Sequence, residues 1–219
     1  SEIAADLSSG HPMHRLLQGE VGSGKTIVAL RTVLHAASEG HQSALLAPTE
    51  VLAEQHYNST IKTLGPDLTR QLGVKLLKGS LSAPERKRAM LDIAGGRSLL
   101  AIGTHALIAE KVSFADLGLV IIDEQHRFGV GQRELLRAKA KQPPHVLTMT
   151  ATPIPRTVAI TTFGDLDIST LTEMPAGRKE IETFVVPVGQ PALVSRVWAR
   201  VSEELSAGRQ AFVVCPRIV

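Results

Sequence analysis

The chain has 219 residues, which is enough for one large domain or for one domain and part of another. A hydrophobic fraction of 43% can fill a core, and an aromatic fraction of only 3% favours helices packed on a sheet over an all-β sandwich. The formal net charge is +3, no apolar run is long enough for a membrane-spanning helix, and the N-terminus lacks a signal-peptide pattern, so we expect a cytoplasmic protein with no membrane partner.

Short apolar runs alternate with helical patterns along the chain. Each run is nearly continuous, as expected for strands that are buried on both faces of a parallel sheet. The predicted strands are 14–18, 43–48, 98–102, 117–122, 145–150 and 210–215. Helical spacing predicts helices from 27 to a stop at Gly40, over 50–64, and over 84–93 with Ser82 as a cap. This alternation indicates an α/β fold in which helices flank a central, mainly parallel sheet.

The composition changes near residue 173, where Pro175 and Gly177 stand among charged residues. Beyond it, a strand is possible over 182–188, and an amphipathic helix is predicted over 191–208. We therefore predict a first domain over residues 1–173, a linker over 174–183 and the start of a second domain over 184–219. The single cysteine, Cys215, lies in the last apolar run, which predicts a buried, unreactive thiol.

The sequence GEVGSGKT, from Gly19 to Thr26, follows the first predicted strand and opens the first long helix. It fits the pattern G-x-x-x-x-G-K-[ST] of phosphate-binding loops, and the flanking strand and helix argue against a glycine-rich turn that binds nothing. Lys25 is expected to reach the β- and γ-phosphates of ATP, and the Thr26 hydroxyl to bind Mg²⁺. The helix N-terminus adds positive potential to backbone N–H groups that can converge on phosphate oxygens, those of Gly19, Glu20, Val21, Gly22, Ser23 and Gly24.

Two acidic residues, Asp123 and Glu124, end the apolar run LVII. Ligands of open parallel sheets bind at the edge where the strands end. If this strand is a neighbour of the strand before the phosphate loop, Asp123 lies beside the metal and holds it, through water, while Glu124 orients and deprotonates the attacking water. The roles of Gln125 and His126 are less determined, since a lone His after a strand is usually structural.

Five segments resemble, in order, the ATPase motifs of superfamily 2 helicases: GEVGSGKT, APTEVLAEQ (47–55), GTHAL (103–107), DEQH (123–126) and MTATPIPRT (149–157). DEQHRFGVGQR and the run over 152–179 resemble the RecG family of bacterial DNA translocases, which remodel branched DNA. The transcription-repair coupling translocase is similar at TPIPRT but usually has DEEQRFGV, and RNA helicases of the DEAD type lack the RFGVGQR extension.

The resemblance implies further roles for individual residues. Gln125, His126, Thr150 and Thr152 would link ATP hydrolysis to domain movement. The motifs that touch the DNA backbone in relatives contain Thr49, Gln55, Thr104 and His105. The alternatives are a helix cap for Thr104 and a solvated helix face for Gln55, although neither excludes a phosphate contact. The loop Arg127–Arg133 is expected to face DNA or the second domain.

The resemblance also implies that parts of the relatives lie outside this chain: an adenine-reading segment, the wedge domain that engages the DNA branch, and most of the second motor domain. We expect a monomer that works with these parts on branched DNA, and a chain that is nearly inactive as an ATPase without them. Basic residues support DNA binding, with eight Lys or Arg against three acids between residues 62 and 97, although a solvated basic face is commoner.

Two readings from other classes stay open at this point. A small P-loop kinase or GTPase would make DEQH and MTATP coincidences, and the absence of the guanine-reading N-K-x-D excludes the GTPase. A non-catalytic DNA-binding module would leave the phosphate loop unexplained, and its affinity for DNA would not depend on Lys25.

Overall fold

The computed structural model describes residues 2–109, 111–123, 139–152, 166–172 and 182–215. The chain divides into two compact units, Ser1–Ala176 and Gly177–Val219. The predicted domain limits at residues 173 and 183 stay a prediction. No helix among the described residues is both long enough and apolar enough to cross a membrane.

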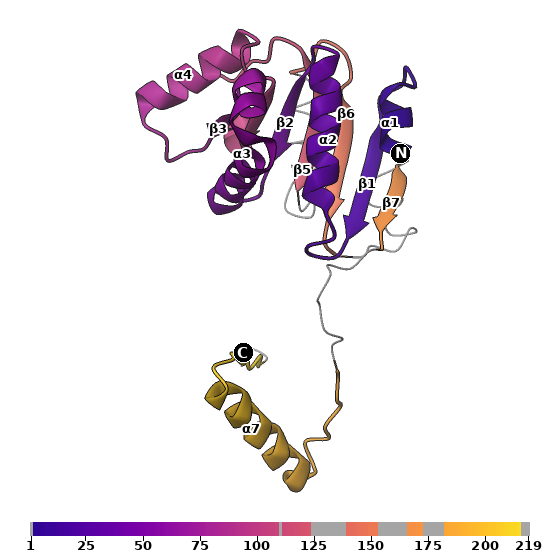
Figure 1. Cartoon of the computed structure of the whole chain (residues 1–219), viewed down its shortest axis with the longest axis vertical. Helices are drawn as coiled ribbons and strands as arrows, with labels where there is room; N and C mark the ends of the chain where they lie inside the picture. Colours follow the sequence, from indigo (N-terminus) through magenta and orange to yellow (C-terminus); the bar gives the residue numbers. More distant parts are fainter. Residues whose placement is uncertain (1, 110, 124–138, 153–165, 173–181, 216–219) are drawn as a thin grey trace. The chain divides into compact units, whose positions relative to one another are not determined.

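The first unit is built on a seven-stranded, all-parallel sheet (Figure 1) with the strand order β3-β4-β2-β5-β6-β1-β7. Its described elements, in chain order, are α1 (Glu2–Leu7), β1 (His14–Gly19), α2 (Lys25–Ser38), β2 (Gln42–Leu46), α3 (Glu50–Leu72), β3 (Lys75–Leu77), α4 (Ala83–Ala94), β4 (Leu100–Gly103), the short 3-10 helix η1 (His105–Leu107), β5 (Leu117–Asp123), β6 (His145–Thr150) and β7 (Asp167–Leu171). The predicted α/β class with a parallel sheet is confirmed.

Both faces of the sheet are covered, which is why its strands are continuously apolar in sequence. Along β5, Leu119 and Ile121 pack into one core, and Val120 and Ile122 pack into the other, as the two-residue period of a strand requires. The first core is closed by α1, α2 and α3, of which α2 and α3 lie over the sheet in Figure 1. The second core is closed by α4 and by the segment that follows η1.

Two helices, α3 and α4, begin at capping residues, of which the sequence predicts Ser82. The Thr49 hydroxyl accepts a hydrogen bond from the Leu52 N–H at 3.3 Å at the start of α3. The Glu85 carboxylate accepts one from the Ser82 N–H at 3.1 Å at the start of α4, as expected in a capping box. The predicted 50–64 helix continues to Leu72 beyond a kink at Gly65, which has φ 73° and is followed by Pro66.

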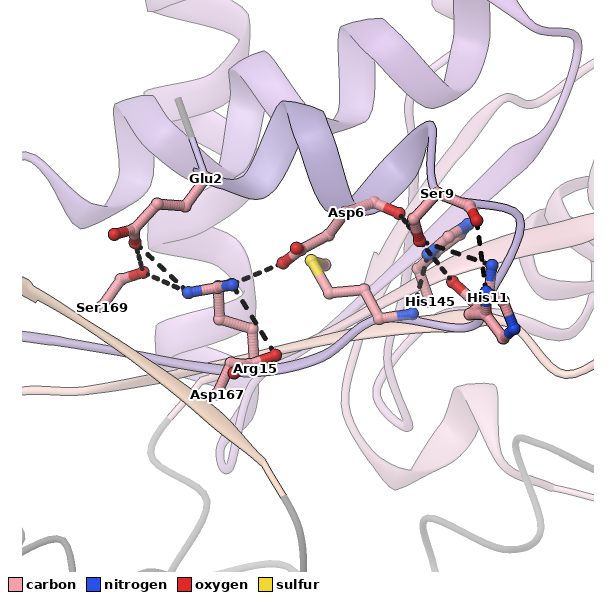
Figure 2. Close-up of polar contacts among 9 residues, drawn as sticks. Glu2, Asp6, Ser9, His11, Arg15, His145, Asp167 and Ser169 are labelled. Carbon is pink, nitrogen blue, oxygen red and sulfur yellow. Dashed lines mark hydrogen bonds and ion pairs between the residues drawn. The ribbon is translucent and has the colours of Figure 1, made fainter.

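A buried arginine ties the first helix to the edge of the sheet (Figure 2). The Arg15 side chain, in β1, is 8% exposed and donates to the Asp6 carboxylate at 2.6 Å and to Glu2 at 3.2 Å. It also lies 3.7 Å from the Asp167 carboxylate and donates to the Ser169 hydroxyl at 2.8 Å, both in β7. This network fixes α1 and the edge strand β7 to β1, the strand that leads into the phosphate loop.

The sequence pattern did not predict α1, the three-residue strand β3, or β7, whose residues are only partly buried. The predicted helix over 191–208 is confirmed as α7 (Pro191–Ser206). The strand predicted over 210–215 is wrong, because the described residues of the C-terminal unit contain no strand and Cys215 is exposed. A buried parallel strand needs strands to pair with and helices to cover it, and the described residues of this unit provide only the helix α7.

Candidate functional site

The candidate residues gather at one edge of the sheet because every strand of a parallel sheet ends there. In register, Gln18 at the end of β1 lies opposite Thr150 at the end of β6, and Met149 lies opposite Asp123 at the end of β5. Thr49 and Thr104 follow the ends of β2 and β4. The carboxyl edge of the sheet therefore brings together residues from most of the predicted motifs, as expected for an open α/β fold.

The phosphate loop is tightly folded between β1 and α2. Gly24 caps α2 with φ 92°, a left-handed conformation that favours glycine, and the Ser23 N–H donates to the Glu20 carbonyl at 3.1 Å. A Cβ on Gly19 would lie 2.6 Å from the Ser23 Oγ and 3.0 Å from the Leu171 Cβ, so the position admits no side chain without movement. Gly24 is thus explained by its backbone conformation and Gly19 by the lack of space for a side chain.

Lys25, the first residue of α2, directs its ammonium back over the loop. Its Nζ donates to the carbonyl oxygens of Gly19 at 2.5 Å and of Glu20 at 2.8 Å. The Ser23 hydroxyl is buried and has no hydrogen-bond partner among the described residues. An ammonium held by exchangeable carbonyls and an unsatisfied hydroxyl next to a helix N-terminus fit a phosphate group, whose oxygens would accept from both.

The residues expected to hold the metal come from two elements. Thr26 lies in the first turn of α2 and is partly exposed, and the Asp123 side chain, at the end of β5, is 15% exposed. A hydroxyl and a carboxylate are oxygen ligands of the kind that Mg²⁺ takes. No group of three or more His, Cys, Asp or Glu residues that could hold a metal exists in the described part of the chain, so a metal here would also need phosphate oxygens and water.

The condition that β5 neighbours the phosphate-loop strand is not met directly, since β6 lies between the two strands. Two strand spacings of about 4.8 Å put the ends of β1 and β5 roughly 10 Å apart. That gap suits a hydrated ion and phosphate groups between the loop and Asp123, and it places Thr150 of β6 in the middle. The order of strands is set by tertiary packing and cannot be read from their sequence.

The Asp123 carboxylate has a partner that the sequence analysis did not single out. Its Oδ2 lies 2.7 Å from the Nε2 of His56, and the His56 side chain is 13% exposed. His56 belongs to α3, three residues after the buried Ala53 and four before the buried Thr60. That helical spacing places it on the inner face of the helix, and this is the signal that could have found it.

Thr150 and Thr152, predicted to couple hydrolysis to movement, are brought together by a turn after β6. Their hydroxyls lie 2.9 Å apart, and the Thr152 N–H donates to the Thr150 hydroxyl at 3.2 Å. Thr150 is buried and Thr152 is exposed, so the pair leads from the core of the sheet to the surface of its carboxyl edge. Their coupling role stays a prediction.

The four predicted DNA contacts differ in exposure. Thr49, Gln55 and His105 are exposed, and Gln55 lies on the outer face of α3, so its alternative as a solvated helix residue also fits. Thr104 is buried, and its hydroxyl accepts from the Ala106 N–H at 3.5 Å, which is the helix-cap alternative. Contact with DNA stays a prediction for all four residues.

An acidic residue near these positions is kept in its charged form. The pKa of Glu50, in the first turn of α3, lies below its ordinary value, chiefly because the Ser80 hydroxyl donates to the carboxylate at 2.7 Å. This negative charge stands directly beside Thr49, one of the four predicted DNA contacts. Glu124, Gln125, His126 and the loop Arg127–Arg133 lie outside the described residues.

A protein-family model described as DEAD/DEAH box helicase matches residues 1–161. Curated proteins with similar sequences include "ATP-dependent DNA helicase RecG" of Mycobacterium tuberculosis, 55% identical over 99% of this chain, and of Bacillus subtilis, 51% identical over 99% of it. The chain spans 31% of the length of each of these two relatives.

Solved structures give the same picture of the fold. A structure of RecG bound to a three-way DNA junction matches 99% of this chain and 28% of that chain, with a TM-score of 0.82 and 44% identity. A DEAD box protein from the hyperthermophile Methanococcus jannaschii matches 78% of this chain and 48% of that chain, with a TM-score of 0.59 and 18% identity, and it shares the fold.

Proposed function

Because the chain belongs to the DEAD/DEAH box helicase family and is 55% identical to RecG helicases over 99% of its length, we propose that it is the ATP-hydrolysing motor domain of a DNA translocase that remodels branched DNA. A transcription-repair coupling motor is the less favoured alternative, since the curated relatives named above are RecG helicases. A kinase, a GTPase or a passive DNA-binding module would leave this similarity unexplained.

The observation that carries the proposal is the position of the Lys25 ammonium, 2.5 Å and 2.8 Å from two carbonyl oxygens of the phosphate loop. Phosphate oxygens of ATP would replace these carbonyls as acceptors, since a charge-assisted hydrogen bond to an anion is stronger than one to a neutral carbonyl. The N-terminus of α2 favours the same negative charge. The loop thus holds the nucleotide by its phosphates.

Three residues would handle the metal and the attacking water. Thr26 and Asp123 would hold Mg²⁺, which supplies positive charge to the phosphate oxygens when it is bound. Glu124, directly after Asp123 in the sequence, would orient the water and accept its proton. Thr150 and Thr152, which lie between the loop and Asp123 along the sheet edge, would transmit the state of the nucleotide to a neighbouring domain.

DNA would lie along the same edge of the sheet, over the ends of β2 and β4. Exposed Thr49, Gln55 and His105 offer donors that suit phosphate oxygens, and such contacts position a protein without reading sequence. We therefore expect binding that prefers branched DNA by shape, and an affinity that falls as salt is added. The remaining parts of a RecG-like protein would contribute the rest of the DNA track and of the ATP site.

Titration calorimetry of Mg·ADP into the chain tests the proposal. Lys25→Ala should weaken binding about 10- to 100-fold, because it removes a charge-assisted hydrogen bond worth roughly 1.5–3 kcal/mol. The matched control is Lys62→Ala, which removes the same charge from an exposed position of α3 and should leave the affinity unchanged. Equal affinity for wild type and Lys25→Ala would remove the loop from the site and contradict the proposal.

A further inference from the structure

His56 connects the helix that carries two predicted DNA contacts to the carboxylate predicted to hold the metal. The Nε2 of His56 lies 2.7 Å from Oδ2 of Asp123, and both side chains are largely buried, 13% and 15% exposed. A carboxylate only accepts hydrogen bonds, so Nε2 carries the hydrogen, and it does so in the neutral as well as in the charged imidazole. The contact therefore does not depend on protonation of the ring.

The two carboxylate oxygens of Asp123 have different surroundings. Oδ2 is engaged by His56, and Oδ1 is the oxygen left for a metal or for its bound water. A carboxylate held by a fixed donor has lost its rotational freedom before the metal arrives, so the metal does not have to order it. Hydrogen bonds of this kind to metal-binding groups typically change metal affinity by about 10- to 100-fold.

The position of His56 on α3 gives the contact a second consequence. Thr49 caps this helix about 10 Å from His56, at a rise of about 1.5 Å per residue. Gln55 precedes His56 directly and is exposed, so one turn of α3 presents an amide to solvent and an imidazole to Asp123. A phosphate bound to Gln55 would therefore lie one residue along the chain from the side chain that holds Asp123.

We propose that His56 is a positioning residue that orients the Asp123 carboxylate for Mg²⁺ and couples this orientation to DNA bound along α3. The inference rests on the proposed function, since it takes Asp123 as a metal ligand and α3 as part of the DNA track. By linkage, DNA changes the affinity for the metal through His56, and the metal changes the affinity for DNA by the same factor.

Two substitutions separate the hydrogen bond from the space that the ring fills. His56→Gln keeps an N–H donor at the corresponding reach, and His56→Leu fills similar space without a donor. His11→Leu is the matched control, because His11 is exposed and precedes β1. The probe is Mn²⁺, which takes the same oxygen ligands as Mg²⁺ and whose free concentration is measured by electron paramagnetic resonance.

In the first experiment Mn²⁺ is titrated into the 219-residue chain saturated with ADP. We expect His56→Leu to weaken Mn²⁺ binding about tenfold or more, and His56→Gln and His11→Leu to stay within about threefold of wild type. Metal-free ADP affinity, measured with a chelator present, should be the same in all four proteins. Unchanged Mn²⁺ affinity in His56→Leu overturns the inference, as does an equal loss of metal-free ADP affinity, which would show a general structural defect.

The second experiment repeats the titration with saturating three-way DNA junction. In wild type the DNA should change the Mn²⁺ affinity by a measurable factor, and this factor should approach 1 in His56→Leu and be restored in His56→Gln. A factor of 1 in wild type, or an unchanged factor in His56→Leu, overturns the coupling. Failure of the proposed function is a separate result, because Lys25→Ala would then bind Mn²⁺ and ADP as wild type does.

Discussion

The Arg15 network predicts an unequal response to removing its members. The arginine side chain is 8% exposed, whereas those of Asp6, Glu2 and Asp167 are 25%, 70% and 72% exposed. Without Asp6, the buried guanidinium keeps the Ser169 hydroxyl and two carboxylates that lie mostly in solvent. Without Arg15, by contrast, the carboxylates can be hydrated with little rearrangement, so the two losses differ in cost.

The magnitudes follow from these exposures. The Arg15–Asp6 contact at 2.6 Å is a charge-assisted hydrogen bond worth roughly 1.5–3 kcal/mol, and its loss leaves a buried charge undercompensated. We therefore expect Asp6→Ala to lower the free energy of unfolding by about 2–3 kcal/mol. Glu2→Ala and Asp167→Ala should each cost at most about 1 kcal/mol, because these two carboxylates lie in solvent, which screens their attraction to Arg15.

The double variant Arg15→Met/Asp6→Ala gives the sharpest comparison. Methionine fills the space of the arginine stem without a buried charge, so the double variant should be more stable than Asp6→Ala alone by about 1 kcal/mol or more. Urea unfolding followed by far-ultraviolet circular dichroism measures each difference. If Asp6→Ala costs no more than Glu2→Ala, or if the double variant is the less stable of the two, the argument from the buried guanidinium is wrong.

Two further predictions concern the phosphate loop and the start of β6. Gly19→Ala should cost about 1–3 kcal/mol of stability and weaken Mg·ADP binding in calorimetry, because its Cβ would lie 3.0 Å from the Leu171 Cβ and 3.1 Å from the Leu171 carbonyl oxygen. An unchanged affinity would contradict this. Burial, followed by the nearby His41, lowers the pKa of His145 below its ordinary value of 6.5. The unfolded chain therefore takes up a proton first as the pH falls through about 6.5, so stability is lost there and levels off below the folded pKa. The Met13 N–H donates a hydrogen bond to the His145 Nδ1 at 3.0 Å, and His145→Asn keeps an acceptor for it. This variant should flatten the pH dependence of the unfolding free energy near pH 6.5. A slope equal to that of wild type would exclude His145 as its source.

The sequence predicted the buried part of the fold well because burial on both faces leaves a clear pattern. The strands ending at Gly19, Asp123 and Thr150 are each marked by a continuous apolar run. β7 escaped detection because it is an edge strand with polar, partly exposed residues, and β3 has only three residues. The run ending at Cys215 has the same pattern as the confirmed strands, so pattern alone could not show that it lacks pairing strands here.

The candidate site was predictable where one motif is contiguous and unpredictable where it depends on packing. GEVGSGKT encodes a loop whose geometry is local, so Gly19 and Gly24 have the strained or crowded positions that the pattern implies. The contact between His56 and Asp123 joins residues that are far apart in sequence, and only the packing of α3 against the sheet brings them together. The insertion of β6 between the loop and Asp123 is likewise a property of the sheet, not of any segment.

The amino and carboxyl edges of the sheet differ in how their polar groups are held. At the amino edge, Gln42 is buried and satisfied by backbone groups, donating to the carbonyls of Ile93 and Ser98 at 2.9 Å and 2.6 Å and accepting from the Asp116 N–H at 2.9 Å. These bonds have no competitor from solvent, so they hold strand ends in place. At the carboxyl edge, Lys25 is bound to loop carbonyls that a phosphate can replace at little cost. The proposed motor domain would bind and release its nucleotide repeatedly, and this division would confine the exchange to one edge of the sheet.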